Sequence, residues 1–164
     1  MRRLVCFTVL GIVFAAAASG LALASSDDGT LSVKAGVGRV NLNFTGSAVG
    51  RVARGSIKVT DPVADDGIGV DVWGCEVLAH DKTDSTTLCR GTGLRFRAIG
   101  GKYQIRIAGA GIYLSAVGHG LVGLNGAGED PNIDSDGTYS LNDQPYKSLP
   151  DLGVTLPLIA PAGG

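Results

Sequence analysis

The sequence predicts a single all-β domain behind a secretion signal, and three observations support this fold class. Glycine accounts for 26 of the 164 residues, a share well above the ordinary value of about 7%. Apolar and polar residues alternate between the glycines, as in residues 39–44, which is the period of a strand with one buried face. No stretch combines helical apolar spacing with capping residues, so we expect little helix.

Residues 1–24 have the features of a secretory signal peptide. Arg2 and Arg3 give a positive start, residues 4–23 are uncharged and mostly apolar, and small residues occupy the cleavage positions at Ala22 and Ala24. The apolar run is also long enough to remain as an uncleaved anchor. We therefore expect a secreted or cell-envelope-associated protein. Its expected parts after the signal are a flexible N-terminal segment (25–36), a β domain (37–158) and a C-terminal tail (159–164).

The charge balance excludes one class of partner. Removal of Arg2 and Arg3 with the signal leaves 12 of the 14 basic residues against 15 acidic residues. Nucleic-acid-binding domains are strongly basic, so this composition predicts no nucleic-acid partner. No segment after the signal is apolar and long enough to be expected to span a membrane.

Two cysteines remain in the exported chain, Cys75 and Cys89. In an oxidising compartment such a pair predicts a disulfide, with two free thiols as the alternative. The closed loop would stabilise the fold by about 3 kcal/mol by restricting the unfolded chain. Trp73, the single tryptophan, is expected to pack against this disulfide in the core. The alternative for Trp73 is a surface platform on which a sugar ring stacks.

Short strands are expected before the disulfide. Residues 39–44 alternate clearly, and residues 50–60 end in a second alternating piece with Gly55 as a bulge. Residues 61–67 contain turn-forming residues, residues 68–78 form a longer apolar run that we interpret as a strand, and residues 79–87 are expected to be a polar loop.

Glycine then recurs at every ninth position, at Gly91, Gly100, Gly109 and Gly118. We interpret this spacing as a four-strand antiparallel meander at about 92–125, with tight turns at the last three of these glycines. The register of that meander places the apolar residues on one face and sets Arg95 opposite Arg106 on the other. The alternative is a parallel β-helix with nine-residue coils, but calcium-binding rolls of that kind carry an aspartate in each repeat and these repeats contain none.

The C-terminal part predicts a hairpin and an edge strand. Residues 138–141 and 146–149 would pair across a turn formed by residues 142–145. Residues 154–156 would add a strand, and Pro157 would block further pairing. The sequence thus predicts about nine to ten short, mainly antiparallel strands in a sandwich or a barrel.

An acidic stretch, EDPNIDSDGTYSLND, resembles the spacing of a calcium loop. With Asn132 counted as the first position of the loop, oxygen ligands fall at its first, third, fifth and twelfth positions, which suits a hard cation. The alternative is a solvated acidic turn. The candidate calcium ligands are Asp130, Asn132, Asp134, Asp136 and Asp143, and calcium is the one cofactor that the sequence suggests.

Arginines mark a second candidate site. Arg95, Arg97 and Arg106 would lie together on the outer face of the meander, where like charges repel each other. A phosphate or carboxylate would relieve this repulsion, so an anionic cell-envelope polymer or polysaccharide is the candidate ligand. The alternative is an ordinary solvated face.

Catalytic patterns are not recognisable. The chain contains no GxSxG motif, its only histidines are His80 and His119, and Asp65 and Asp66 adjoin each other in a turn-like run. We therefore expect no enzymatic activity.

The Gly-spaced, Arg-bearing run at 90–126 and the later GTYSLNDQPYKSLP resemble a block in uncharacterised secreted Gly-rich β-domain proteins of high-GC Gram-positive bacteria. The resemblance covers roughly residues 50–150 and implies no activity, cofactor or site residue. Together these observations predict an exported, non-catalytic structural or binding module of the cell envelope. The alternative is a calcium-dependent carbohydrate-binding module.

Overall fold

The computed structural model describes residues 27–63, 69–128 and 136–161. Within these ranges the chain is all-β, contains no helix, and forms one antiparallel sheet. The predicted fold class is therefore confirmed, with seven strands in place of the expected nine or ten.

Two of the strands are very long: β1 (Gly29–Thr60) has 32 residues and β4 (Thr86–Gly126) has 41 residues. The others are short: β2 (Val70–Trp73), β3 (Val77–Asp81), β5 (Thr138–Leu141), β6 (Lys147–Ser148) and β7 (Val154–Leu158).

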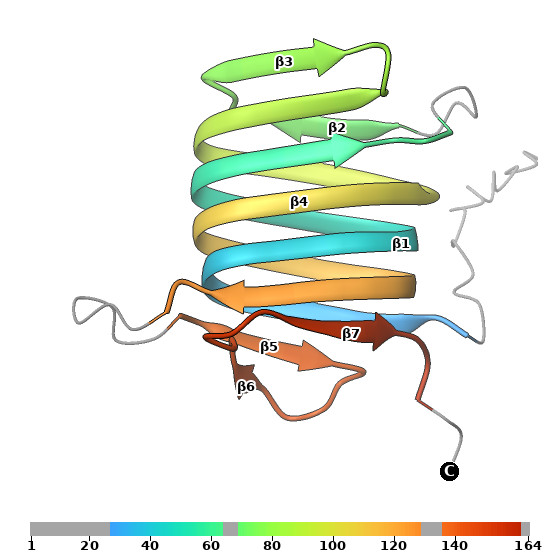
Figure 1. The fold of residues 1–164 in the computed structure, drawn as a ribbon, viewed down its shortest axis with the longest axis vertical. Helices are drawn as coiled ribbons and strands as arrows, with labels where there is room; N and C mark the ends of the chain where they lie inside the picture. The colour runs from blue at the N-terminus through green and yellow to red at the C-terminus, as the bar shows by residue number, and fades with distance from the viewer. Residues whose placement is uncertain (1–26, 64–68, 129–135, 162–164) are drawn as a thin grey trace, which may run out of the picture.

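β1 and β4 pair with each other in two registers. In the first register they form one long hairpin, which runs from Thr60 opposite Thr86 to Gly29 opposite Gly118. In the second register residues 38–60 of β1 also pair with residues 104–126, the next turn of β4. The two-stranded ribbon is therefore wound into a coil, and each turn is hydrogen-bonded to the turn that follows it (Figure 1).

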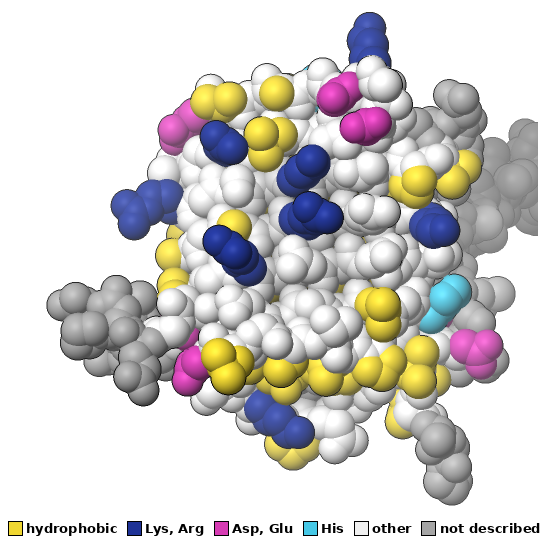
Figure 2. Space-filling view, in the orientation of Figure 1, with side chains coloured by type: hydrophobic (Ala, Val, Ile, Leu, Met, Phe, Trp, Pro, Cys, Tyr) yellow, Lys and Arg dark blue, Asp and Glu magenta, His cyan; other side chains and the backbone are white. Residues whose placement is uncertain are grey.

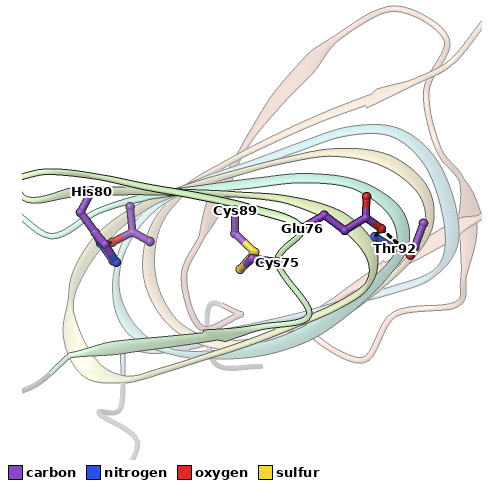
Figure 3. Close-up of a disulfide and its surroundings, with 6 residues drawn as sticks. Cys75, Glu76, His80, Cys89 and Thr92 are labelled. Carbon is purple, nitrogen blue, oxygen red and sulfur yellow. Dashed lines mark hydrogen bonds between the residues drawn. A yellow bond between two sulfur atoms is a disulfide. The ribbon is translucent and has the colours of Figure 1, made fainter.

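The nine-residue glycine spacing is half a turn of this coil. Gly46 of β1 pairs with both Gly101 and Gly118, so one full turn of β4 takes 17 residues at this point. Viewed along its axis the coil is a flattened oval, and the strands bend sharply at its two narrow edges (Figure 3). The cross-strand pairs place glycines in two columns half a turn apart: Gly126, Gly38, Gly109, Gly55 and Gly91 in one, and Gly29, Gly118, Gly46 and Gly101 in the other.

Glycine is required at these bends because two backbones approach each other closely. Gly55 and Gly109 are cross-strand partners with φ of 155° and 151°. A Cβ atom on Gly55 would collide with the carbonyl oxygen of Ala108, and one on Gly109 would collide with that of Arg54. Only a residue without a side chain fits both this backbone conformation and this separation.

The predicted four-strand meander at 92–125 is therefore wrong. Gly100, Gly109 and Gly118 are bends within the single strand β4 and not hairpin turns. Arg95 consequently lies opposite Arg51 and not opposite Arg106. The alternative of a parallel β-helix is also wrong, because all neighbouring strands are antiparallel. The predicted buried face is confirmed: Phe96, Ile105 and Leu114 are all buried.

The flattening of the coil produces two layers with the core between them. We call the layer that includes β3 and β7 the first layer and the layer that includes β2, β5 and β6 the second layer. In Figure 1 the first layer faces the viewer and β2 lies behind it. From β3 to β7, the first layer is built from residues 77–81, 86–90, 56–60, 104–108, 39–43, 120–124 and 154–158. From β2 to β6, the second layer is built from residues 70–73, 95–98, 48–52, 112–116, 31–34, 138–141 and 147–148.

The core is closed at both ends of the coil. At the end formed by β2 and β3, Cys89 is fully buried. At the other end, Leu149 and Leu158 are buried beside the core. Burial of such aliphatic side chains contributes about 1.5–3 kcal/mol each.

The ends of the domain depart in part from the prediction. β1 begins at Gly29, so residues 29–36 belong to the sheet and not to a flexible segment. The predicted hairpin is present as β5 and β6, and Asn142 and Asp143 at its turn have φ of 52° and 57°. β7 is the expected edge strand and pairs with β4 alone, but it extends past the predicted residues 154–156, through Pro157 to Leu158.

The predicted signal at residues 1–24 lies outside the described residues. Within the part of the chain that the structure describes, no helix has the length and apolar character needed to cross a membrane.

Candidate functional site

Cys75 and Cys89 form the predicted disulfide. The bond joins the connection between β2 and β3 to the first part of β4, and it lies within the oval of the coil (Figure 3). Beside it, the Glu76 carboxylate accepts hydrogen bonds from the backbone nitrogen of Thr92 at 3.1 Å and from its hydroxyl at 2.8 Å. These contacts fasten the β2–β3 connection to the coil and thereby fix the position of β2.

Trp73 lies outside the core. Its side chain is 50% exposed on the outer surface of the second layer, where it lies opposite Arg95. The core position expected for Trp73 is therefore wrong. The single tryptophan of the protein is a surface residue, and the next two residues across the sheet from it are Arg95 and Arg51.

The three predicted arginines do not form one cluster. Arg95 and Arg97 pair with β2 and point outward from the second layer, whereas Arg106 pairs with Asn41 and Lys58 on the outer surface of the first layer. The two outer surfaces lie on opposite sides of the coil. The structure thus divides the predicted arginine site between two separate faces.

The first of these surfaces we call the amide face. It consists of outward-pointing side chains from three neighbouring strand segments of the first layer: Arg39, Asn41, Asn43, Lys58, Gln104 and Arg106. They line a hollow of about 630 Å³. Figure 2 views this side of the molecule, where Lys and Arg side chains gather over the coil. Amide groups and cations are combined here in one open groove.

The cations of the amide face form no ion pair with any described acidic residue. Lys58 lies directly opposite Arg106, which is an unfavourable like-charge pair. Among the described residues, the one ion pair joins His119 to Asp28, which is at a bend of the coil. A bound anion would relieve the repulsion between Lys58 and Arg106, and the side-chain amides beside them can donate hydrogen bonds to it.

A second hollow of about 450 Å³ adjoins the amide face. It shares Lys58, Gln104 and Arg106 with the first hollow and is also lined by Asp61 and Asp84. The groove therefore has acidic residues at one end, toward the loops near β3, and amides and cations along the rest.

The opposite surface we call the aromatic face. Its side chains come from the second layer and from the β5–β6 hairpin: Trp73, Arg95, Arg51, Tyr113, Lys34 and Tyr146. Most of them line a hollow of about 520 Å³. The Arg51 guanidinium carbon lies 4.1 Å from the centre of the Tyr113 ring, and Lys34 Nζ lies 4.0 Å from the centre of the Tyr146 ring. Each aromatic ring of this face thus has a cation as its neighbour.

Tyr146 has a perturbed acidity. Its hydroxyl donates a hydrogen bond to Ser32 Oγ at 2.9 Å, and Lys34 lies beside it. When the phenol is deprotonated, the Ser32 hydroxyl can donate this hydrogen bond in the reverse direction, and this bond, followed by the interactions with Lys34, lowers the pKa of Tyr146 below its ordinary value. The ring is therefore held in place by both neighbours.

Of the candidate calcium ligands, Asp130, Asn132 and Asp134 lie outside the described residues. Asp136 and Asp143 are described, and they lie beyond opposite ends of the strand β5. Asp136 accepts a hydrogen bond from the backbone nitrogen of Gly128 at 3.0 Å. Among the described residues no group of three or more metal-ligating side chains occurs.

The two histidines occupy separate positions. His80 Nδ1 is 2.9 Å from Thr87 Oγ1 on the edge strand β3, and His119 Nδ1 is 2.9 Å from Asp28 Oδ1. The second contact ties the start of β1 to a bend of β4.

No family model, no curated protein and no solved structure matches the chain.

Sequence reasoning missed Arg39, Asn41, Asn43 and Lys58 as members of a site. The alternating pattern of residues 39–44 did place Arg39, Asn41 and Asn43 on the outer face of a strand. A run of amides and a cation at every second position of a strand was the available signal, because such side chains share one surface.

Proposed function

We propose that this protein is an exported, non-catalytic module that binds an anionic polymer of the cell envelope along its amide face. The Cys75–Cys89 disulfide is compatible with an extracellular location. The predicted secretion signal supports the same location.

The observation that carries the proposal is the cross-strand pair of Lys58 and Arg106 in a groove lined with amides. Two cations held side by side on a rigid sheet repel each other, and none of the described residues forms an ion pair with either of them. Carboxylate or phosphate groups of a ligand would convert this repulsion into attraction, at about 1.5–3 kcal/mol for each charge-assisted hydrogen bond.

The shape of the groove favours a polymer over a small ion. The groove crosses several strand segments and is open to solvent, and its polar groups are distributed along it. Neighbouring strands are about 4.8 Å apart, so the groove offers successive contacts at the spacing of the sheet. A linear chain with repeated negative charges could occupy several of these contacts at once.

Isothermal titration calorimetry of the folded protein with three polymers tests the proposal. The probes are polygalacturonate, poly(glycerol phosphate) and neutral dextran. We expect binding to at least one of the anionic polymers and none to dextran. Replacement of both Lys58→Gln and Arg106→Gln should weaken binding by about tenfold or more, as the loss of about 1.4 kcal/mol requires.

The matched control changes two exposed cations outside the groove, Arg54→Gln and Lys102→Gln. It removes the same formal charge and should leave the affinity within about threefold of the original. No binding to either anionic polymer would falsify the proposal. Equal weakening by both double substitutions would also contradict it, since it would indicate attraction by net charge alone.

A further inference from the structure

The aromatic face exposes rings that a folded domain normally buries. Trp73 is 50% exposed and Tyr113 is 37% exposed, and both belong to strands whose other side packs in the core. The hollow that they line also exposes Val49, which is 48% exposed. An apolar patch of this kind, bordered by polar groups, marks an interaction surface.

The rings and cations lie in one continuous row across four strand segments. Trp73 pairs with Arg95, Arg95 pairs with Arg51, and Arg51 pairs with Tyr113. Three steps between neighbouring strands place the two rings about 14 Å apart. This separation exceeds a single ring and fits a short stretch of a linear molecule.

The charges of the row restrict the ligand. Arg51 and Arg95 face each other as a like-charge pair, and neither forms an ion pair with any described residue. Arg97 lies on the adjacent row, where the exposed acid Asp71 is its cross-strand partner, so Arg51 and Arg95 are the cations of the row that have no acidic partner among the described residues. A second copy of this chain would bring cations against cations at this face, so self-association through it is disfavoured.

Saccharides with carboxylates satisfy both features. The apolar C–H side of a pyranose ring can pack on an indole or phenol ring, because these side chains are amphipathic and present a broad flat surface. A carboxylate on the same sugar can accept hydrogen bonds from an arginine guanidinium in a bidentate manner. In the row, each ring has an arginine as its cross-strand neighbour.

We propose that the aromatic face is a second, calcium-independent site for a uronate-containing saccharide, so that one molecule bridges two polymer chains. The bridging part rests on the proposed function of the amide face. The two faces lie on opposite sides of a rigid two-layered coil, so one polymer segment cannot occupy both sites of the same molecule. Two sites on one rigid body bind a multivalent polymer more tightly than either site does alone.

Tryptophan fluorescence reports this site selectively, because Trp73 is the only tryptophan in the chain. An oligogalacturonide of defined length should change the Trp73 emission on titration, with and without a calcium chelator. The double variant Arg95→Gln and Tyr113→Ala retains the tryptophan and should reduce the apparent affinity by about tenfold or more. Leu152→Ala, a change at an 83% exposed residue outside both faces, is the control and should have no effect.

Bridging is measured by light scattering with long polygalacturonate. The unaltered protein should produce large complexes that are most abundant at an intermediate ratio of protein to polymer. A variant of either face, Arg95→Gln with Tyr113→Ala or Lys58→Gln with Arg106→Gln, should bind without forming them.

The two proposals fail in different ways. An unchanged Trp73 emission during binding that depends on Lys58 and Arg106 overturns the second site and leaves the proposed function intact. A Trp73 response in the absence of any effect of Lys58 and Arg106 contradicts the proposed function and bridging, and it supports the aromatic site alone. A response to anionic lipid vesicles but not to oligogalacturonide would overturn the saccharide as the ligand of this face.

Discussion

The amide face and the aromatic face are both outer surfaces of the same sheet, and both carry cations. They differ in the side chains that lie beside those cations. Each face carries one cross-strand pair of cations, Lys58 with Arg106 on the amide face and Arg51 with Arg95 on the aromatic face. On the first face the pair lies among side-chain amides, and on the second it lies between Trp73 and Tyr113. The cations alone therefore do not distinguish the two sites, and the residues beside them determine which ligands each site can select.

The comparison also shows why one strand can supply two different surfaces. β4 passes through the first layer and the second layer in alternate half-turns, so its outward residues are divided between the faces. Four changes to the molecule or its conditions would affect the two faces differently, and they follow in order of decreasing effect.

The largest effect is expected from Gly55→Val, which should destroy both faces together. The new side chain would meet the carbonyl oxygen of Ala108, and φ at this position is 155°. We expect a loss of about 3 kcal/mol or more in the free energy of unfolding, measured by urea denaturation. Gly69→Ala is the control, since no described atom outside its two chain neighbours lies within 4 Å of its added Cβ, and it should change stability by less than about 0.5 kcal/mol. Similar losses in both variants would contradict the close approach at the bends.

The disulfide should matter more to the aromatic face than to the amide face. Replacement of Cys75→Ser together with Cys89→Ser should lower the free energy of unfolding by about 3 kcal/mol. Because Trp73 lies two residues before Cys75, the response of Trp73 to oligogalacturonide should weaken at temperatures below the unfolding transition. Calorimetric binding at Lys58 and Arg106 should persist under the same conditions. Equal loss at both faces in the folded variant would argue against this difference.

Salt should weaken binding at the two faces to different extents, and the difference should be smaller than the effects above. An increase from about 0.1 M to about 1 M sodium chloride shortens the screening length from about 10 Å to about 3 Å. Binding at the amide face, which depends on exposed cations, should weaken by about tenfold. Binding at the aromatic face should weaken by about threefold, because the ring contacts are insensitive to screening. Calorimetry on the two double variants measures each face separately, and equal salt dependence would refute the assignment of ring contacts to one face.

The smallest effect concerns Tyr146. Its lowered pKa means that the folded protein favours the deprotonated phenol, so the resulting stability is present at pH above the unfolded pKa and is lost as pH falls through the folded pKa. Ultraviolet difference absorbance against Tyr146→Phe should give a midpoint below the ordinary value, and Ser32→Ala should raise it. The Arg106→Gln variant of the amide face should leave it unchanged. A midpoint at the ordinary value would mean that Ser32 and Lys34 do not hold the ring as described.

The alternation of the sequence predicted the class of fold and the buried face but not the path of the chain. Ala98 and Tyr103 are both buried on either side of Gly100 and Gly101. A two-residue hairpin loop changes the buried positions from even-numbered to odd-numbered residues, and so does a bend that contains one extra residue. The pattern of buried residues is therefore the same for a meander and for a coil. The signal that favoured the coil was the matching spacing in the first strand, at Gly29, Gly38, Gly46 and Gly55, which a meander confined to residues 92–125 does not explain.

The candidate sites were predicted only as far as local geometry allowed. Arg97 and Arg106 were correctly expected to point outward, since both follow the alternation. They are nine residues apart. In a meander this spacing leads to the neighbouring strand of the same sheet surface, whereas in the coil it leads half a turn around the axis. The same spacing that would have made them neighbours on one surface therefore places them on opposite surfaces. The pairing of Arg106 with Lys58 depends on the register between successive turns, which no local pattern encodes.

The winding of a single hairpin has a consequence for folding kinetics. Thr60 and Thr86 start the first register, and every later pair in it closes a longer loop of chain. Our hypothesis is that strand pairing begins at this end, next to Cys75 and Cys89, where the loop to be closed is shortest. Each completed turn then presents a strand edge to which the next turn can form hydrogen bonds. Quenched-flow hydrogen exchange should then protect the amides near Thr60 and Thr86 before those near Gly29 and Gly118, and the reverse order would rule this hypothesis out.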